Sequence, residues 1–232
     1  GTDVNSCINT DMITVTVNAL PTVTASSSPV SPLCDGDVLT LTGGGATSYI
    51  WDNSVVDNTP FTPLVGTVTY TVTGTDVNSC INTDMITVTV NPLPTVIMSG
   101  STSICDGEST ALDFNFTGTG PYNINYDINS TNTSAVLNNN VDSIIVSPST
   151  ITTYNLINVT DAYCSNSANG TVIITVNPLP SATISGGGTL CADGSTAQID
   201  IIANGSAPFN VIYSNGFTNT PLAINGKLKS GA

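Results

Sequence analysis

The chain has 232 residues, of which 16 are acidic and only two, Lys227 and Lys229, are basic. A formal charge of −14 without Arg, His or any basic patch excludes nucleic acid as a partner, because phosphates are bound by Lys and Arg. The same charge excludes electrostatic docking on anionic membranes, and no apolar run reaches the roughly 18 residues that a membrane span needs.

The first eighteen residues, GTDVNSCINTDMITVTVN, return without change at residues 74–91. The match continues to Val23 and Val96, with only Ala19 and Pro92 differing, so the period is 73 residues. A diverged copy ends 86 residues further on, in a second Asn-Pro-Leu-Pro segment. Self-similarity at such spacing predicts tandem repeats. We divide the chain into the end of one repeat, two complete repeats and the beginning of another: 1–18, 19–91, 92–177 and 178–232.

Alternation of β-branched residues with threonine predicts short strands. Turn residues such as Asp, Asn and Gly recur about every ten positions, and no segment has helical periodicity. In the first complete repeat we expect strands, in chain order, at Thr22–Ser26, Val38–Thr42 and Ser48–Asp52, at the edges within 53–66, and in a hairpin of Thr67–Thr73 with Met85–Val90.

An aromatic residue lies on the third predicted strand of each repeat. Trp51 occupies the place of the central aromatic in an immunoglobulin-like sandwich. Tyr126 and Tyr213 align with it in the following repeats. We interpret all three as core residues rather than as a sugar-binding surface. The predicted fold class is therefore all-β, with tandem immunoglobulin-like β-sandwich repeats, and the short proline-rich linkers favour an extended rod.

The six cysteines follow the repeat. One kind precedes an acidic glycine turn, and the other kind ends the penultimate strand; we call them the lower cysteines (Cys34, Cys105 and Cys191) and the upper cysteines (Cys7, Cys80 and Cys164). Without His and without a Cys-x-x-Cys motif, disulfides are favoured over zinc. Disulfides indicate an oxidising, extracytoplasmic compartment.

Two pairings of these cysteines are open. One joins the two cysteines of each repeat, as Cys34–Cys80 and Cys105–Cys164. The other is staggered and joins Cys34 to Cys164, with the remaining cysteines bonded to further repeats. A strand of five or six residues spans about 17–20 Å, whereas bridged Cα atoms lie within about 7 Å, which counts against the first pairing.

Acidic residues recur at equivalent turns, and oxygen-rich turns suit calcium. The alternative is that they are solvated turn residues that keep the chain soluble. The residues that would bind calcium are Asp35, Asp37, Asp106, Glu108 and Asp193. No other metal or cofactor is expected.

No catalytic constellation is present in the sequence. Nucleophilic catalysis of the Ser-His-Asp or Cys-His kind has no base, because the chain lacks His. Paired aspartates could cut glycosidic bonds, but aspartates that recur at turns are better explained as turn formers. We do not expect an enzyme.

The motifs together resemble a known family. Cys-Asp-Gly before a strand, then TYTVTGTDVNSC and ITVTVNPLPT, resemble the immunoglobulin-like or PKD-like repeats of very large secreted surface proteins of Bacteroidota, including gliding-motility adhesins. The resemblance implies export by the type IX system and a location outside the cell or at its surface.

The expected function is that of a non-catalytic segment of a repetitive extracellular fibre or cell-surface adhesin stalk. Its partners would be neighbouring repeats of the same chain and other copies in a filament. Two alternatives remain: a carbohydrate- or protein-binding module, and an accessory region of a secreted multidomain enzyme.

Overall fold

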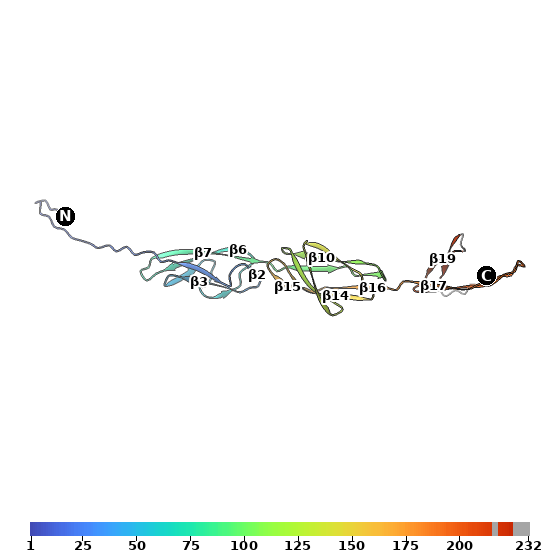
Figure 1. The fold of residues 1–232 in the computed structure, drawn as a ribbon. Helices are drawn as coiled ribbons and strands as arrows, with labels where there is room; N and C mark the ends of the chain where they lie inside the picture. The colour runs from blue at the N-terminus through green and yellow to red at the C-terminus, as the bar shows by residue number, and fades with distance from the viewer. Residues whose placement is uncertain (215–217, 225–232) are drawn as a thin grey trace. The chain divides into compact units, whose positions relative to one another are not determined.

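A computed structural model describes residues 1–214 and 218–224 (Figure 1). These residues form strands, turns and extended segments, and none of them is helical. No helix that could cross a membrane is present in this part of the chain. The chain divides into two compact units, of which the first comprises Gly1–Thr95, Thr117–Asn123 and Val159–Ser167 and the second comprises the rest.

The complete repeat of the first unit is a sandwich of two sheets. One sheet has the order β1-β3-β5, and the other has the order β2-β7-β6-β4. The strands are β1 (Thr24–Ser28), β2 (Leu33–Cys34), β3 (Leu39–Gly44), β4 (Ser48–Trp51), β5 (Pro60–Phe61), β6 (Gly66–Thr75) and β7 (Ile81–Asn91). The expected strands are present, but β1 begins two residues later than predicted and the predicted edge region contains the single short strand β5. The β6–β7 hairpin is longer than predicted at both ends.

Strand β2 was not predicted. It contains two residues and pairs in parallel with the end of β7, so that Leu33 lies opposite Val90 and Cys34 opposite Asn91. Asp35 continues this pairing, because its N–H donates to the carbonyl of Asn91 at 2.9 Å. A lower cysteine is therefore fixed at the C-terminal end of β7.

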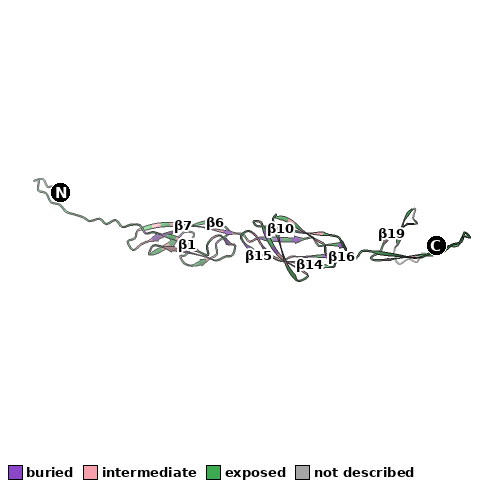
Figure 2. Ribbon diagram, viewed as in Figure 1, coloured by how far each residue is buried: buried purple, intermediate pink, exposed green. Residues whose placement is uncertain are grey.

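The core of this sandwich follows from the alternation in its strands. In β3 and β6 buried residues alternate with partly exposed ones, so burial falls on one side of each strand. Figure 2 shows the buried residues in purple. Phe61 packs edge-to-face on Tyr70 with their ring centroids 5.8 Å apart. The buried residues are Val23, Leu33, Leu39, Leu41, Trp51, Tyr70, Val72, Val88 and Val90.

The second complete repeat also has two sheets, with two strands more in total. Their orders are β13-β10-β8 and β12-β11-β14-β16-β9, with β15 paired to β14. The strands are β8 (Thr95–Ser99), β9 (Thr102–Cys105), β10 (Thr110–Thr117), β11 (Tyr122–Ile128), β12 (Thr131–Leu137), β13 (Val141–Val146), β14 (Thr152–Thr160), β15 (Ser165–Ser167) and β16 (Thr171–Asn177). Strand β9 pairs in parallel with β16 and places Cys105 opposite Asn177, which repeats the β2–β7 arrangement.

Beyond residue 177 the second unit contains two separate two-stranded sheets. They are formed by β17 (Ser181–Gly186) with β18 (Ile199–Asn204), and by β19 (Phe209–Ser214) with β20 (Asn219–Ile224).

Residues 1–18 and residues 74–91 have the same sequence but different structural surroundings. Residues 76–80 form a turn in which the N–H of Asp76 donates to the carbonyl of Cys80 at 3.0 Å, and the identical residues 3–7 form the same turn at 3.0 Å. In contrast, β7 has no counterpart in residues 8–18, which are exposed and carry only an isolated bridge from Thr2 to Ile8. The turn is therefore determined locally, whereas the strand requires β6 as a partner.

The alternation of burial predicts unequal effects of truncating two adjacent residues. Leu39 is fully buried and Val38 is 54% exposed. Leu39→Ala is expected to lower the free energy of unfolding by about 2–5 kcal/mol, because it leaves a cavity in the core. Val38→Ala is the matched control and is expected to change it by less than about 0.5 kcal/mol. Urea denaturation measures both; equal losses would contradict the assignment of the two faces.

Candidate functional site

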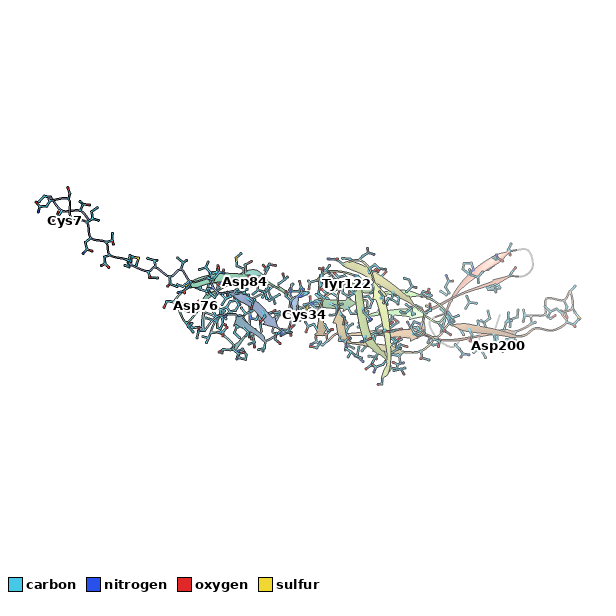
Figure 3. The ribbon with its side chains drawn as sticks, turned by 60° about the vertical axis from the view of Figure 1, so that its left-hand side comes forward. Cys7, Cys34, Asp76, Asp84, Tyr122 and Asp200 are labelled. Carbon is cyan, nitrogen blue, oxygen red and sulfur yellow. A yellow bond between two sulfur atoms is a disulfide. The ribbon has the colours of Figure 1, made fainter. Side chains whose placement is uncertain are left out.

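The chemically distinctive feature of the structure is a disulfide between Cys34 and Cys164, both of which belong to the first unit (Figure 3). Their Cα atoms are 5.8 Å apart, and 130 positions separate them in the sequence. Of the two pairings left open by the sequence, the structure therefore contains the staggered one. Among the described residues the other four cysteines, Cys7, Cys80, Cys105 and Cys191, are free thiols.

The pairing within a repeat fails because β7 is long. Cys34 lies opposite Asn91 at one end of β7, and Cys80 directly precedes Ile81 at the other end. Figure 3 shows the same separation, with Cys34 and Asp76, the first residue of the turn of Cys80, at opposite ends of the sandwich. Eleven residues of strand span about 34 Å, several times the reach of a disulfide.

Each lower cysteine begins a tight turn. The N–H of Asp37 donates to the carbonyl of Cys34 at 3.0 Å, and the N–H of Cys34 donates to the carboxylate of Asp37 at 2.8 Å. Gly36 has a φ of +91°, a backbone conformation that residues other than glycine rarely adopt. Cys105 and Glu108 make the same two hydrogen bonds, at 2.8 and 3.0 Å. The free Cys105 is thus held in the conformation of the bonded Cys34.

Each upper cysteine ends a turn organised by an aspartate. The carboxylate of Asp161 accepts hydrogen bonds from the N–H groups of Cys164 at 2.7 Å, Tyr163 at 2.9 Å and Thr119 at 2.9 Å. Asp76 accepts in the same way from the N–H of Cys80 at 2.9 Å. The free Cys80 therefore has the local support of the bonded Cys164.

The electrostatics of the Cys164 turn depend on these donors. Partial burial tends to raise the pKa of Asp161, but the N–H groups of Cys164, Thr119 and Tyr163 stabilise its charged form more strongly. The pKa of Asp161 is therefore held below its ordinary value.

For two upper cysteines, Cys164 and Cys80, a side-chain amide two residues further on binds the linker that precedes the same repeat. The Nδ2 of Asn166, two residues after Cys164, donates to the carbonyl of Pro94 at 3.0 Å. The Nδ2 of Asn82, two residues after Cys80, donates to the carbonyl of Pro21 at 2.9 Å. This Cys-x-Asn motif was visible in the sequence but was not recognised there.

The residues considered for calcium lie in three separate turns. Asp37 and Glu108 cap their own turns, and Asp193 accepts the N–H of Ser195 at 3.0 Å. No three His, Cys, Asp or Glu side chains among the described residues come close enough together to hold a metal ion. Backbone donors thus satisfy Asp37, Glu108 and Asp193 within their turns, while Asp35 and Asp106 are exposed.

Two of the three expected core aromatics are enclosed. Trp51 and Tyr126 are 5% and 6% exposed, and burial raises the pKa of Tyr126. The indole N–H of Trp51 donates to the carboxylate of Asp57 at 2.8 Å. Tyr213 differs, because it is 42% exposed on β19, whose sheet has two strands. The prediction that Tyr213 lies in a core stays a prediction, because the described part of its repeat contains two two-stranded sheets and no complete sandwich.

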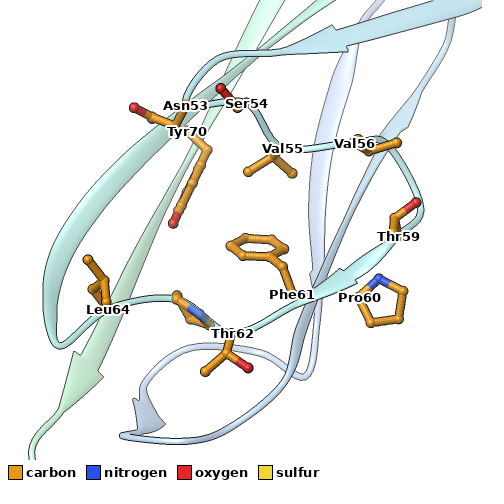
Figure 4. A pocket seen from close by; sticks show the side chains of 11 residues that line it. Asn53, Ser54, Val55, Val56, Thr59, Pro60, Phe61, Thr62, Leu64 and Tyr70 are labelled. Carbon is orange, nitrogen blue, oxygen red and sulfur yellow. The ribbon is translucent and has the colours of Figure 1, made fainter.

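The first sandwich also contains a hollow of about 310 Å³, lined by residues 53–56, 59–64 and Tyr70 (Figure 4). The ring of Phe61 lies below Val55 and beside Tyr70 in this view. Burial and the nearby Asp52 raise the pKa of Tyr70, so its phenol remains neutral. No charged side chain lines the hollow, and it is best described as an open margin of the core.

A comparison with protein families agrees with the fold of the second complete repeat. Residues 94–171 match the family model described as "Nucleoporin POM152, Ig-like domain". The sheet orders β1-β3-β5 and β2-β7-β6-β4 also place strands as in immunoglobulin sandwiches. The repeats are immunoglobulin-like. The predicted fold class, all-β with tandem Ig-like sandwiches, is thereby confirmed.

Solved structures of other Ig-like arrays resemble the chain at low identity. An I-band fragment of titin is 14% identical over 90% of this chain and 89% of that one, with a TM-score of 0.49. The eight N-terminal Ig domains of Down Syndrome Cell Adhesion Molecule are 13% identical over 84% and 31%, with a TM-score of 0.37. A search of curated protein sequences found no match.

Replacing Asp161 tests the turn of Cys164. Asp161→Ala removes the acceptor of three N–H groups and is expected to lower the free energy of unfolding by about 1–3 kcal/mol at pH 7. Because the folded-state pKa of Asp161 is depressed, its contribution is present above its unfolded pKa of about 4 and is lost as the pH falls through the folded value. Urea denaturation at pH 7 and in acid should therefore show a difference between wild type and variant that closes in acid.

Asp35→Ala is the matched control for this experiment. Asp35 is exposed, and its carboxylate accepts no hydrogen bond from the described residues. Its replacement should leave the stability unchanged at pH 7. A loss of stability in Asp161→Ala that persists undiminished in acid would show that the carboxylate is not the cause.

Proposed function

We propose that this chain is a structural, non-catalytic segment of a repetitive extracellular fibre or cell-surface adhesin stalk. In this role the tandem repeats act as a spacer whose length grows with the number of repeats. The observation that carries this proposal is the Cys34–Cys164 disulfide, which joins residues of two successive Ig-like repeats by a covalent bond.

The disulfide supports a location outside the cytoplasm, because such bonds persist in oxidising compartments. Secreted surface proteins of Bacteroidota, which the repeat motifs resemble, are exported by the type IX system. We extend both the source and the route of export to this chain as part of the proposal.

The arrangement of the acidic residues supports a structural role. Eleven of the sixteen carboxylates accept a hydrogen bond from a backbone N–H: Asp3, Asp11, Asp37, Asp52, Asp57, Asp76, Asp84, Glu108, Asp142, Asp161 and Asp193. Carboxylates committed to turns and strand ends stabilise a fold, whereas general acids and bases must face a substrate. The tandem repetition of units also supports a structural role, because each added unit lengthens the array.

Surface labelling of cells that produce the protein tests the proposal. An antibody against residues 19–177 should bind intact cells, and deletion of one complete repeat should shorten the labelled projections seen by electron microscopy. Labelling only after the cells are permeabilised would contradict an extracellular role.

A repeat exchange provides the control. Replacing residues 92–177 with a second copy of 19–91 retains the number of repeats but changes the loops. A stalk should keep its length and its adhesion in this variant, whereas loss of adhesion at normal length would favour the alternative of a binding module.

A further inference from the structure

We infer that Cys34–Cys164 is one rung of an overlapping disulfide ladder, in which Cys80 and Cys105 are cross-linking sites for cysteines of neighbouring Ig-like repeats, and that this ladder carries tension past the folded sandwiches. The inference deepens the proposed stalk function and rests on it for its biological meaning. The observations behind it are the connectivity of the bond and the equivalence of the free and bonded cysteines.

The first step is that Cys105 occupies the same position in its repeat as Cys34, the lower cysteine of the observed bond, does in the preceding repeat. It lies opposite Asn177 in the parallel β9–β16 pair, as Cys34 lies opposite Asn91. Its turn repeats the hydrogen bonds of the Cys34 turn, with Glu108 in place of Asp37. Its partner is therefore the upper cysteine of the following repeat, a thiol in an aspartate turn.

The second step is that Cys80 occupies the same position in its repeat as Cys164, the upper cysteine of the observed bond, does in the following repeat. Its turn has the aspartate acceptor of the Cys164 turn, in Asp76. Its neighbour Asn82 holds the linker carbonyl of Pro21, as Asn166 holds that of Pro94. Its partner is therefore the lower cysteine of the preceding repeat, a thiol that begins a Cys-Asp-Gly turn.

The chemistry of each rung is an ordinary oxidation. Two thiols lose two protons and two electrons to a disulfide-carrying oxidant, which becomes a dithiol. The thiol of Cys105 is exposed and that of Cys80 is partly exposed, so both can meet such an oxidant.

The third step concerns where tension travels. Cys34 and Cys164 close a loop with a sequence separation of 130, so with this one bond a pull on the two chain ends passes through the sulfur atoms and leaves that loop unloaded. At about 3.3–3.6 Å per residue, the loop hides about 450 Å of chain. Unfolding of the sandwiches does not release this length.

Repeated rungs give two interleaved paths. One path runs from Cys34 to Cys164 and then along residues 165–190 to Cys191; the other passes along residues 81–104, from Cys80 to Cys105. Each path reaches its next rung without crossing a complete repeat. Reduction of one rung therefore leaves the other path closed, and the stalk keeps its length under load.

Force spectroscopy on the purified chain, held at its two ends, tests the bypass. Fully extended, the oxidised chain should be about 450 Å shorter than the chain in a thiol reductant. Oxidised Cys34→Ser/Cys164→Ser should extend as far as the reduced wild type, whereas Cys80→Ser/Cys105→Ser should remain short. Full extension does not depend on folding, so a destabilised variant remains informative. Equal extension of oxidised and reduced wild type would overturn the bypass.

Peptide mapping of the natural protein without reduction tests the ladder. We expect Cys105 linked to a peptide with an aspartate turn of a following repeat, and Cys80 linked to a Cys-Asp-Gly peptide of a preceding one. Free thiols at both positions in the mature protein would overturn the ladder. A short oxidised chain, together with protein found only inside cells, would contradict the stalk function and leave the bypass intact.

Discussion

The parallel pairing of β2 with β7 is the constraint on which the remaining structure depends. It contains two residue pairs, Leu33 with Val90 and Cys34 with Asn91. Leu33 and Val90 are both buried, so a shift by one residue would expose them and turn Cys34 to the other face. The hydrophobic effect thus sets the position of a covalent bond. The β9–β16 pair repeats the arrangement in the next repeat, so the constraint belongs to the repeat itself.

In this protein carboxylates are stabilised by backbone hydrogen bonds, whereas in most proteins they are stabilised by ion pairs. With two basic residues in the sequence, the sixteen acids have almost no cationic partners, and a net charge of −14 disfavours a compact state. Hydrogen bonds from backbone N–H groups stabilise carboxylates without a cation, as at Asp161 and Asp76. The same bonds fix the turns that present the cysteines. The same hydrogen bonds therefore stabilise the charged carboxylates and position the cysteines for the disulfide.

Much of the fold could be predicted from the sequence, because alternation of Val and Ile with Thr fixes both strand type and buried face. The hairpin of β6 and β7 and the burial of Trp51 follow from it. Strand β2 could not be predicted in this way, since two residues carry no period. The choice of disulfide depended on that strand, and so it stayed open. Tyr213 shows what alignment leaves open: alignment with Trp51 gives its position in a repeat, but burial requires a second sheet, and Tyr213 is 42% exposed in the described part of its repeat.

The eighteen-residue duplicate distinguishes what positions the upper cysteines from what positions the lower cysteines. The turn ending at Cys7 has the same hydrogen bonds as the turn ending at Cys80, so bonds within the turn itself hold an upper cysteine in place. A lower cysteine is positioned only when β2 pairs with β7, which requires the closed sheet. In that sheet Cys34 and Cys80 lie at opposite ends of an eleven-residue strand. Formation of the sheet therefore prevents the bond within a repeat, and the cysteine of the next repeat is the partner that the folded sandwich leaves within reach of Cys34.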